Sequence, residues 1–366
     1  MALPPRYIAM VLTGEPDLVP DAPIAVHQSR RLFTSDTPHA HYSASLAQLS
    51  SSRLVMVFSW APGVLRRNNS VMLTSRSEDD GASWTEPEAI YAKPGWDCMH
   101  LGGLMRFSDE RLLLGLGRIQ MDPSLPGDEP CTGWYLSTTC SADGGETWGP
   151  ESPEIRLFPE WSELYGASNP HLLDDGRHML AVIGTTGRDS GWQAGVCFTD
   201  DEGETYSAPV IVASHPTLGF GDMDIVRLAD GRYMAVARVF DGHPSVVAYS
   251  SDDGSSWTEP RPVEFWGANI KLQRLRSGAL LCAYRDEAGN RSGVGCSVSE
   301  DDGATWRRIG WLARPSDGPP PAAGDVRCGY PDMAVLQNGR LGCVLAPSAD
   351  ADGIIDLRWL ELIDRT

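Results

Sequence analysis

The feature that most constrains this chain is an octapeptide of the form Ser/Thr-x-Asp-x-Gly-x-x-aromatic. Its five copies are Ser77–Trp84, Ser141–Trp148, Thr199–Tyr206, Ser250–Trp257 and Ser299–Trp306. One copy carries little information, whereas five copies along a chain indicate a fold built from repeated units. The residue types suit a tight hairpin, because the Asp carboxylate can accept backbone N–H groups, Gly tolerates a positive φ and the aromatic ring can cover the turn.

These octapeptides are Asp boxes, and a second repeat runs between them. An apolar strand, a short turn and another apolar strand recur, as in Asp224–Arg238, with six turns at Ser52, Glu110, Gly176, Gly231, Gly278 and Gly339. Six hairpins with short turns and many β-branched and aromatic residues predict an all-β, six-bladed β-propeller. We expect residues 1–366 to form one propeller domain, with an N-terminal segment near residues 8–12 or 24–26 closing the last blade.

Composition excludes several classes of function. The 30 Lys and Arg against 49 Asp and Glu give a net charge of −19, which disfavours nucleic acid and anionic membranes as partners. The N-terminus lacks a signal peptide pattern and no apolar run is long enough to span a bilayer, which predicts a soluble, cytoplasmic protein. The 8 Cys show no C-x-x-C spacing and several lie in strand-like runs, which favours buried thiols. No metal site and no cofactor are predicted, and the oligomeric state is left open.

The repeat also predicts where a functional site lies, since the inner strands of all blades direct equivalent positions to one central cavity. Counting nine residues back from each turn gives Ser43, Leu101, Ala167, Asp222, Asn269 and Tyr330. Counting seven residues forward gives Ser59, Gly117, Ile183, Arg238, Arg285 and Ala346. Polar residues within two positions of these include His41, Tyr42, His100, Arg118 and Asn169. Converging polar groups in a central depression are the default candidate for a binding site.

At this point the chain resembles the sialidase (neuraminidase) superfamily, through its Asp boxes, its six hairpins and three local motifs. The run from Asp222 to Arg238 is similar to a family segment that begins with a catalytic Glu and ends with an arginine of the carboxylate-binding triad. Arg291 is placed like another triad arginine, with Arg285 as a nearby alternative. Tyr330 in R-C-G-Y-P-D-M resembles the family's tyrosine nucleophile, which implies that Asp222 activates Tyr330.

The chain departs from the family pattern at two places. Where the family has its first arginine, this sequence has His41 and Tyr42. Where the family has an acid/base Asp, residues 65–67 contain no carboxylate. The acid could instead come from Asp36, Asp97, His41 or His100. Tyr42, Asn269 and Asp97 complete the predicted substrate-binding residues.

Three functions remain open from the sequence. The leading prediction is an exo-acting glycosidase that cleaves a small, acidic terminal sugar of the sialic acid or uronic acid type, with a carbohydrate as its partner. A polysaccharide lyase or another exo-glycosidase acting on uronate-containing glycans would use the same arginines. A non-catalytic glycan-binding propeller is the third reading.

Overall fold

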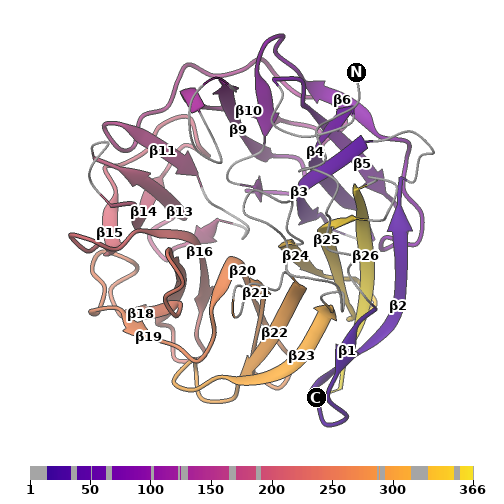
Figure 1. The fold of residues 1–366 in the computed structure, drawn as a ribbon, viewed down its shortest axis with the longest axis vertical. Helices are drawn as coiled ribbons and strands as arrows, with labels where there is room; N and C mark the ends of the chain where they lie inside the picture. Colours follow the sequence, from indigo (N-terminus) through magenta and orange to yellow (C-terminus); the bar gives the residue numbers. More distant parts are fainter. Residues whose placement is uncertain are drawn as a thin grey trace.

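The computed structural model describes residues 15–33, 39–50, 52–62, 68–99, 103–122, 124, 131–164, 170–186, 191–286, 288, 293–314, 329–349 and 355–365. Within these ranges the protein is all-β without an α-helix, and its strands form a ring of six blades (Figure 1). The predicted fold class, a six-bladed β-propeller, is therefore confirmed. No helix in the described part of the chain is long and apolar enough to cross a membrane.

The blades follow the chain in order, each with its innermost strand first. Blade 1 contains β3 (His39–Gln48), β4 (Leu54–Pro62), β5 (Val71–Ser77) and β6 (Glu88–Tyr91). Blade 2 contains β7 (Asp97–Met99) with β8 (Leu104–Arg106), β9 (Leu112–Met121) and β10 (Cys131–Ser141). Blade 3 contains β11 (Trp161–Leu164) with β12 (His171–Leu172), β13 (His178–Thr185), β14 (Gln193–Thr199) and β15 (Val210–Ala213).

Blades 4 to 6 complete the ring. Blade 4 contains β16 (Phe220–Arg227), β17 (Tyr233–Val239), β18 (Val246–Ser250) and β19 (Arg261–Pro262). Blade 5 contains β20 (Gly267–Arg274), β21 (Leu280–Asp286), β22 (Gly293–Ser299) and β23 (Arg307–Ala313), with β1 (Asp17–Leu18) at its outer edge. Blade 6 contains β24 (Gly329–Val335), β25 (Leu341–Ala349) and β26 (Ile355–Asp364), and β2 (Ile24–Leu32) pairs antiparallel with β26.

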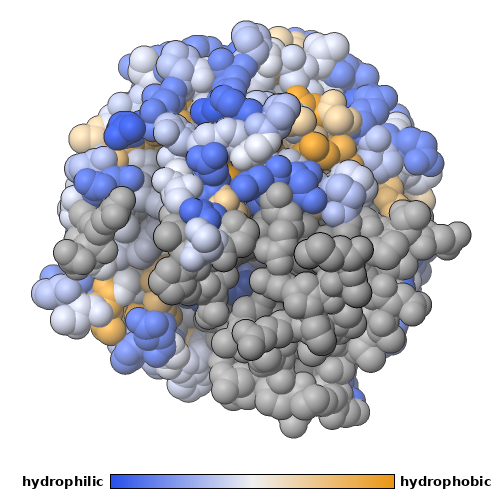
Figure 2. All heavy atoms as spheres, turned by 45° about the horizontal axis from the view of Figure 1, so that its top comes forward, coloured by the Kyte–Doolittle hydropathy of each residue, from blue (hydrophilic) through white to orange (hydrophobic). Residues whose placement is uncertain are grey.

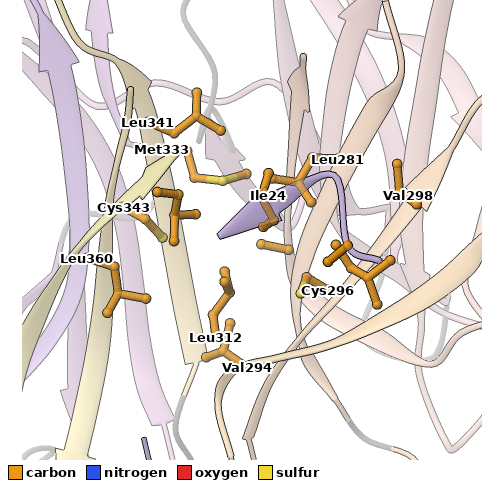
Figure 3. Close-up of a cluster of buried hydrophobic side chains, with 14 of the residues drawn as sticks. Ile24, Leu281, Val294, Cys296, Val298, Leu312, Met333, Leu341, Cys343 and Leu360 are labelled. Carbon is orange, nitrogen blue, oxygen red and sulfur yellow. The ribbon is translucent and has the colours of Figure 1, made fainter. Parts of the chain in front are cut away.

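The outer strand β2 is anchored by an apolar cluster between blades 5 and 6. Ile24 is fully buried there, and Figure 3 shows its side chain among residues of both blades, including Leu281, Met333 and Leu341. Burying an isoleucine contributes about 1.5–3 kcal/mol. Strand β2 is therefore held by side-chain packing as well as by strand pairing, whereas residues 8–12 lie outside the described part of the chain.

Each Asp box joins its own blade to the preceding one. In the box of blade 4, Asp252 accepts the Ser256 backbone N–H (2.9 Å) and the Ser250 hydroxyl (2.8 Å), and Gly254 has a φ of 80°. A Cβ on Gly254 would collide with Met179 of blade 3. The glycines of the other boxes face the preceding blade in the same way: Gly81 faces Trp359, Gly145 faces Val55, Gly203 faces Leu113 and Gly303 faces Met234. Glycine is thus required for the turn and for close contact between blades.

The described cysteines are consistent with packing residues. Cys98, Cys140, Cys197, Cys282, Cys296 and Cys343 carry free thiols, and all except the half-buried Cys140 are buried. Burial raises the pKa of the Cys98 thiol to about 11 and that of the Cys296 thiol to about 12, so both stay protonated near neutrality.

Candidate functional site

Four of the central positions predicted by counting share an unusual backbone conformation. Ser43, Asp222, Asn269 and Tyr330 have φ values of 50°, 40°, 49° and 48°. Each lies in a β-bulge of its innermost strand, where the pairing register shifts by an extra residue. A non-glycine residue with positive φ is uncommon, and bulges next to functional sites often redirect a side chain. Four blades thus repeat one strained feature on the inner strands.

The opposite strands match this register. Ser59, Gly117, Ile183, Arg238, Arg285 and Ala346 pair with Tyr42, Met99, Glu163, Gly221, Ala268 and Gly329, respectively. The residues directly before the four bulge residues are therefore level with the predicted ends of the second strands. Arg238 and Arg285 lie at equivalent places in blades 4 and 5, beside Asp222 and Asn269.

Asp222, Arg238 and Asn269 form a hydrogen-bonded cluster across blades 4 and 5. Arg238 Nη1 donates to Asp222 Oδ2 (3.0 Å), and Asn269 Nδ2 donates to Asp222 Oδ1 (3.4 Å). The Arg238 guanidinium also lies over the Phe240 ring, 4.7 Å from its centroid. The Arg238 side chain remains 20% exposed. Its guanidinium is thus held by two neighbours and still reaches solvent.

Tyr330 lies one blade further round the ring. Its strand β24 contacts β20, which in turn contacts β16, so the strand of Asn269 separates those of Asp222 and Tyr330. A Cβ on the preceding Gly329 would come within 2.9 Å of Asn269 Oδ1 and 3.1 Å of Arg285 Cδ. The absent side chain allows blade 6 to approach blade 5 beside Tyr330. The half-buried Tyr330 packs against the apolar cluster that contains Phe58 and Leu46.

A buried carboxyl group, Glu163, lies on the innermost strand of blade 3. Glu163 is 7% exposed and its Oε1 accepts a hydrogen bond from Trp161 Nε1 at 2.9 Å. Burial raises the pKa of Glu163 to about 8, and the nearby charge of Asp222 acts in the same direction. Trp161 stacks on Trp134 (3.8 Å between centroids) and meets Trp192 edge-on. Burial thus favours the protonated form of this carboxyl group, which lies beside an aromatic wall formed by these tryptophans.

A second set of buried charges joins blades 4, 5, 6 and 1. Lys271 Nζ lies 2.7 Å from Asp332 Oδ1. Asp332 also accepts the Leu46 backbone N–H of blade 1, and Asp224 accepts that of Leu272 in blade 5. Burial raises the pKa of Asp224 to about 6 despite the opposing charge of Lys271, and it raises the pKa of Asp332 as well. Each carboxylate thus satisfies a backbone donor of the next blade.

Asp97 has a different environment from the other candidates. Its carboxylate accepts the backbone N–H groups of Asn68, Asn69 and Ser70 at 3.0–3.1 Å. These bonds attach a segment of blade 1 to blade 2 and occupy both carboxylate oxygens. Arg118, close to a predicted position, pairs with Glu151 at 2.9 Å and lies over Trp96 and Tyr135.

Several predicted residues lie outside the part of the chain that can be described. These are Asp36, His100, Leu101, Ala167, Asn169 and Arg291, together with the side chains of His41 and Tyr42. Their roles stay predictions. Among the described residues, no group of three or more His, Cys, Asp or Glu side chains is placed to hold a metal ion.

Sequence reasoning missed Glu163 and Lys271. Counting from the blade 3 turn gives Ala167, whereas strand pairing sets Glu163 opposite Ile183. Blade 3 has additional residues between β11 and β12, so a count of nine from the turn does not reach the residue opposite Ile183. The alternating residue types of Trp161-Ser-Glu-Leu were the sequence signal for strand β11. Lys271 stands two residues after Asn269, as Asp224 stands after Asp222 and Asp332 after Tyr330.

The described surface gives no sign of a broad apolar interface on the face drawn in Figure 2. Hydrophilic residues dominate its described part, and hydrophobic residues form separate small groups. This distribution agrees with the net charge of −19.

Residues 124–343 match the family model described as a BNR repeat-like domain. A sialidase of Paraclostridium sordellii is 24% identical over 195 residues, 45% of this chain and 48% of that protein, so the match spans about half of the relative's length.

Two solved structures share the fold. A protein of unknown function from Dyadobacter fermentans superposes with a TM-score of 0.78 at 21% identity, covering 95% of this chain and 100% of that one. A Hadza microbial sialidase superposes with a TM-score of 0.65 at 18% identity, covering 88% of this chain and 66% of that one.

Proposed function

Because the chain belongs to the BNR repeat-like domain family and has a sialidase-like propeller fold, we propose that it is an exo-acting glycoside hydrolase for a small, acidic terminal sugar. The observation that carries the proposal is the set of strained bulges. They put Asp222, Asn269 and Tyr330 at equivalent positions of three consecutive blades, with Arg238 and Arg285 beside them. Strain of this kind costs about 1–3 kcal/mol per residue and is typical of functional sites.

In the proposed reaction Tyr330 is the nucleophile. Asp222 accepts the phenolic proton while Tyr330 Oη attacks the anomeric carbon, and the bond to the leaving oxygen breaks as that oxygen takes a proton from a general acid. Water then hydrolyses the glycosyl–tyrosine bond, and Asp222 returns its proton to the phenolate. A neutral nucleophile suits an acidic sugar, because a carboxylate nucleophile would be repelled by the substrate's own charge.

Arg238 and Arg285 are proposed to bind the substrate carboxylate, with Arg291 as a further candidate. A guanidinium presents two parallel N–H donors that match a carboxylate. Asp222 and Phe240 hold the Arg238 guanidinium before substrate arrives, which reduces the entropy lost on binding. Local positive charge is needed here, since the protein as a whole repels anions. Tyr42 and Asn269 are proposed to contact the sugar beside them.

The test is a panel of aryl glycosides that includes sialic acid and uronic acid derivatives, with the released phenol measured. We expect turnover with at least one acidic sugar and with none of its neutral counterparts. An unsaturated product absorbing in the near ultraviolet would identify a lyase instead. Binding of acidic glycans without any turnover would identify a glycan-binding propeller and contradict hydrolysis.

A further inference from the structure

We infer that Glu163 is the proton donor to the leaving group, taking the place of the acid/base Asp that the sequence lacks in blade 1. The inference rests on the proposed function. The observation behind it is the position of Glu163 on the innermost strand of blade 3. Glu163 lies at the same height in the ring as Gly221 of blade 4, which directly precedes Asp222.

The contacts of Glu163 separate it from the other buried acidic residues of the described chain. Asp222, Asp286, Asp332 and Glu361 each pair with a cation, and Asp97 and Asp224 each accept backbone N–H groups. Glu163 has neither kind of partner among the described residues; its hydrogen bond comes from the neutral Trp161 indole. A buried carboxyl without a counter-charge destabilises a fold when it is ionised, so a purely structural role gives no reason for an acid here.

The surroundings of Glu163 suit a carboxylic acid that is kept protonated and then releases its proton. Its strand β11 contacts β9, β10 and β13. On β9, Arg118 is paired with Glu151; on β10, Tyr135 lies against Trp96 and Arg118. On β13, Ile183 is opposite Glu163, and His178 lies at the other end of the strand against Phe107. Among the described residues, Asp222 of the neighbouring blade is the charged group that raises the pKa of Glu163.

The aromatic wall beside Glu163 gives the leaving sugar a surface. The rings of Trp134, Trp161, Trp192 and Phe240 contact one another in sequence across blades 2, 3 and 4. Phe240 is also the ring beneath the Arg238 guanidinium, so the wall leads from the carboxylate-binding arginine to Glu163. Flat aromatic faces bind the apolar faces of sugar rings, which would orient the glycosidic oxygen toward the acid.

Glu163 supplies one proton and recovers it in the proposed reaction. As Tyr330 Oη bonds to the anomeric carbon, the leaving oxygen takes the Glu163 proton and departs as an alcohol. The Glu163 carboxylate then removes a proton from water, whose oxygen displaces the Tyr330 phenolate. Asp222 returns the phenolic proton to Tyr330, so that all three residues regain their starting states. The requirement for protonated Glu163 predicts that kcat/KM falls with increasing pH, with a midpoint near the pKa of about 8.

The experiment compares Glu163→Gln with the wild type on two substrates of the same sugar, one with an activated phenol and one with an alkyl or sugar leaving group. We expect kcat/KM for the poor leaving group to fall by about 10²–10⁴-fold and for the activated one by less than about tenfold. The alkaline decrease should disappear in the variant. Glu160→Gln, an exposed neighbour, is the matched control and should behave as wild type.

A second variant keeps the inference testable if Glu163→Gln folds poorly. Trp161→Phe removes the N–H that favours ionised Glu163, so the alkaline limb should move to higher pH. If Glu163→Gln lost kcat/KM equally on both substrates and kept the alkaline limb, the role of Glu163 would be overturned but the proposed function would stand. An alkaline limb that does not move in Trp161→Phe would have the same consequence. Absence of wild-type turnover on every glycoside would instead overturn the proposed function, and this inference with it.

Discussion

Removing the buried cation Lys271 should destabilise the ring strongly and in a pH-dependent way. The Lys271 side chain is 6% exposed, that of its partner Asp332 is 2% exposed, and Asp224 acts on the same ammonium. Burial disfavours the Lys271 ammonium, but the two carboxylates outweigh this effect and raise its pKa. Lys271→Met leaves both carboxylates without a counter-charge, and breaking a buried pair in this way costs about 3–5 kcal/mol.

The sign of the pH dependence follows from the raised pKa values. Asp224 has a pKa of about 6 when folded and an ordinary value of 3.8, so the folded protein binds this proton more tightly than the unfolded chain does. Its contribution to stability is therefore present at low pH and declines as the pH rises from about 4 to about 6. Without Lys271 this decline should extend to higher pH, so that Lys271→Met loses less stability at pH 5 than at pH 8.

Urea unfolding monitored by tryptophan fluorescence at both pH values measures this loss. Arg232→Met is the matched control, because Arg232 and Asp230 form an exposed pair with side chains 41% and 47% accessible. Removing such a pair changes the unfolding free energy by about 0–1 kcal/mol. A Lys271→Met loss as small as that of the control, or one that is equal at pH 5 and pH 8, would refute the reasoning.

Three further outcomes are expected. Trp257→Ala should lower the unfolding free energy by about 3 kcal/mol while affinity for substrate hardly changes, because this ring covers an Asp-box turn; a large loss of affinity at an unchanged melting temperature would argue otherwise. Arg238→Lys should raise KM more than it lowers kcat, since an ammonium cannot form two parallel bonds to a carboxylate; unaltered KM would speak against substrate binding. Turnover should survive EDTA, and restoration of an EDTA-sensitive activity by a divalent ion would show that a metal takes part.

The repeat made much of the central geometry predictable. In blades 1, 4, 5 and 6 a fixed count from the hairpin turn reaches Ser43, Asp222, Asn269 and Tyr330, all of which adopt the same bulge. The count works because the two inner strands pair residue by residue from the turn upward, so equal length means equal height in the ring. Because of this hydrogen-bonded pairing, residues at the same number of positions from the turn lie at the same height in each of these blades.

The count fails where a blade carries inserted residues. In blade 3 the innermost strand is divided into β11 and β12. Glu163 therefore lies at the height in the ring that the fixed count had assigned to Ala167. Lys271 was missed for another reason. It stands two residues after Asn269, as Asp224 and Asp332 stand two residues after Asp222 and Tyr330, but the spacing alone does not show that Lys271 pairs with Asp332 of the neighbouring blade. The burial that raises the pKa of Glu163 is likewise a property of the assembled ring.

The measurement that tests the central claim most directly is the turnover of Tyr330→Phe on the acidic glycoside that the wild type cleaves. The substitution removes one oxygen from a half-buried ring that packs against the apolar cluster of blades 6 and 1, so the fold should be retained. If Tyr330 is the nucleophile, kcat should fall by orders of magnitude, and Asp222→Asn should have a comparable effect because the phenol is no longer activated. Near-normal turnover in a folded Tyr330→Phe protein would contradict the proposed mechanism.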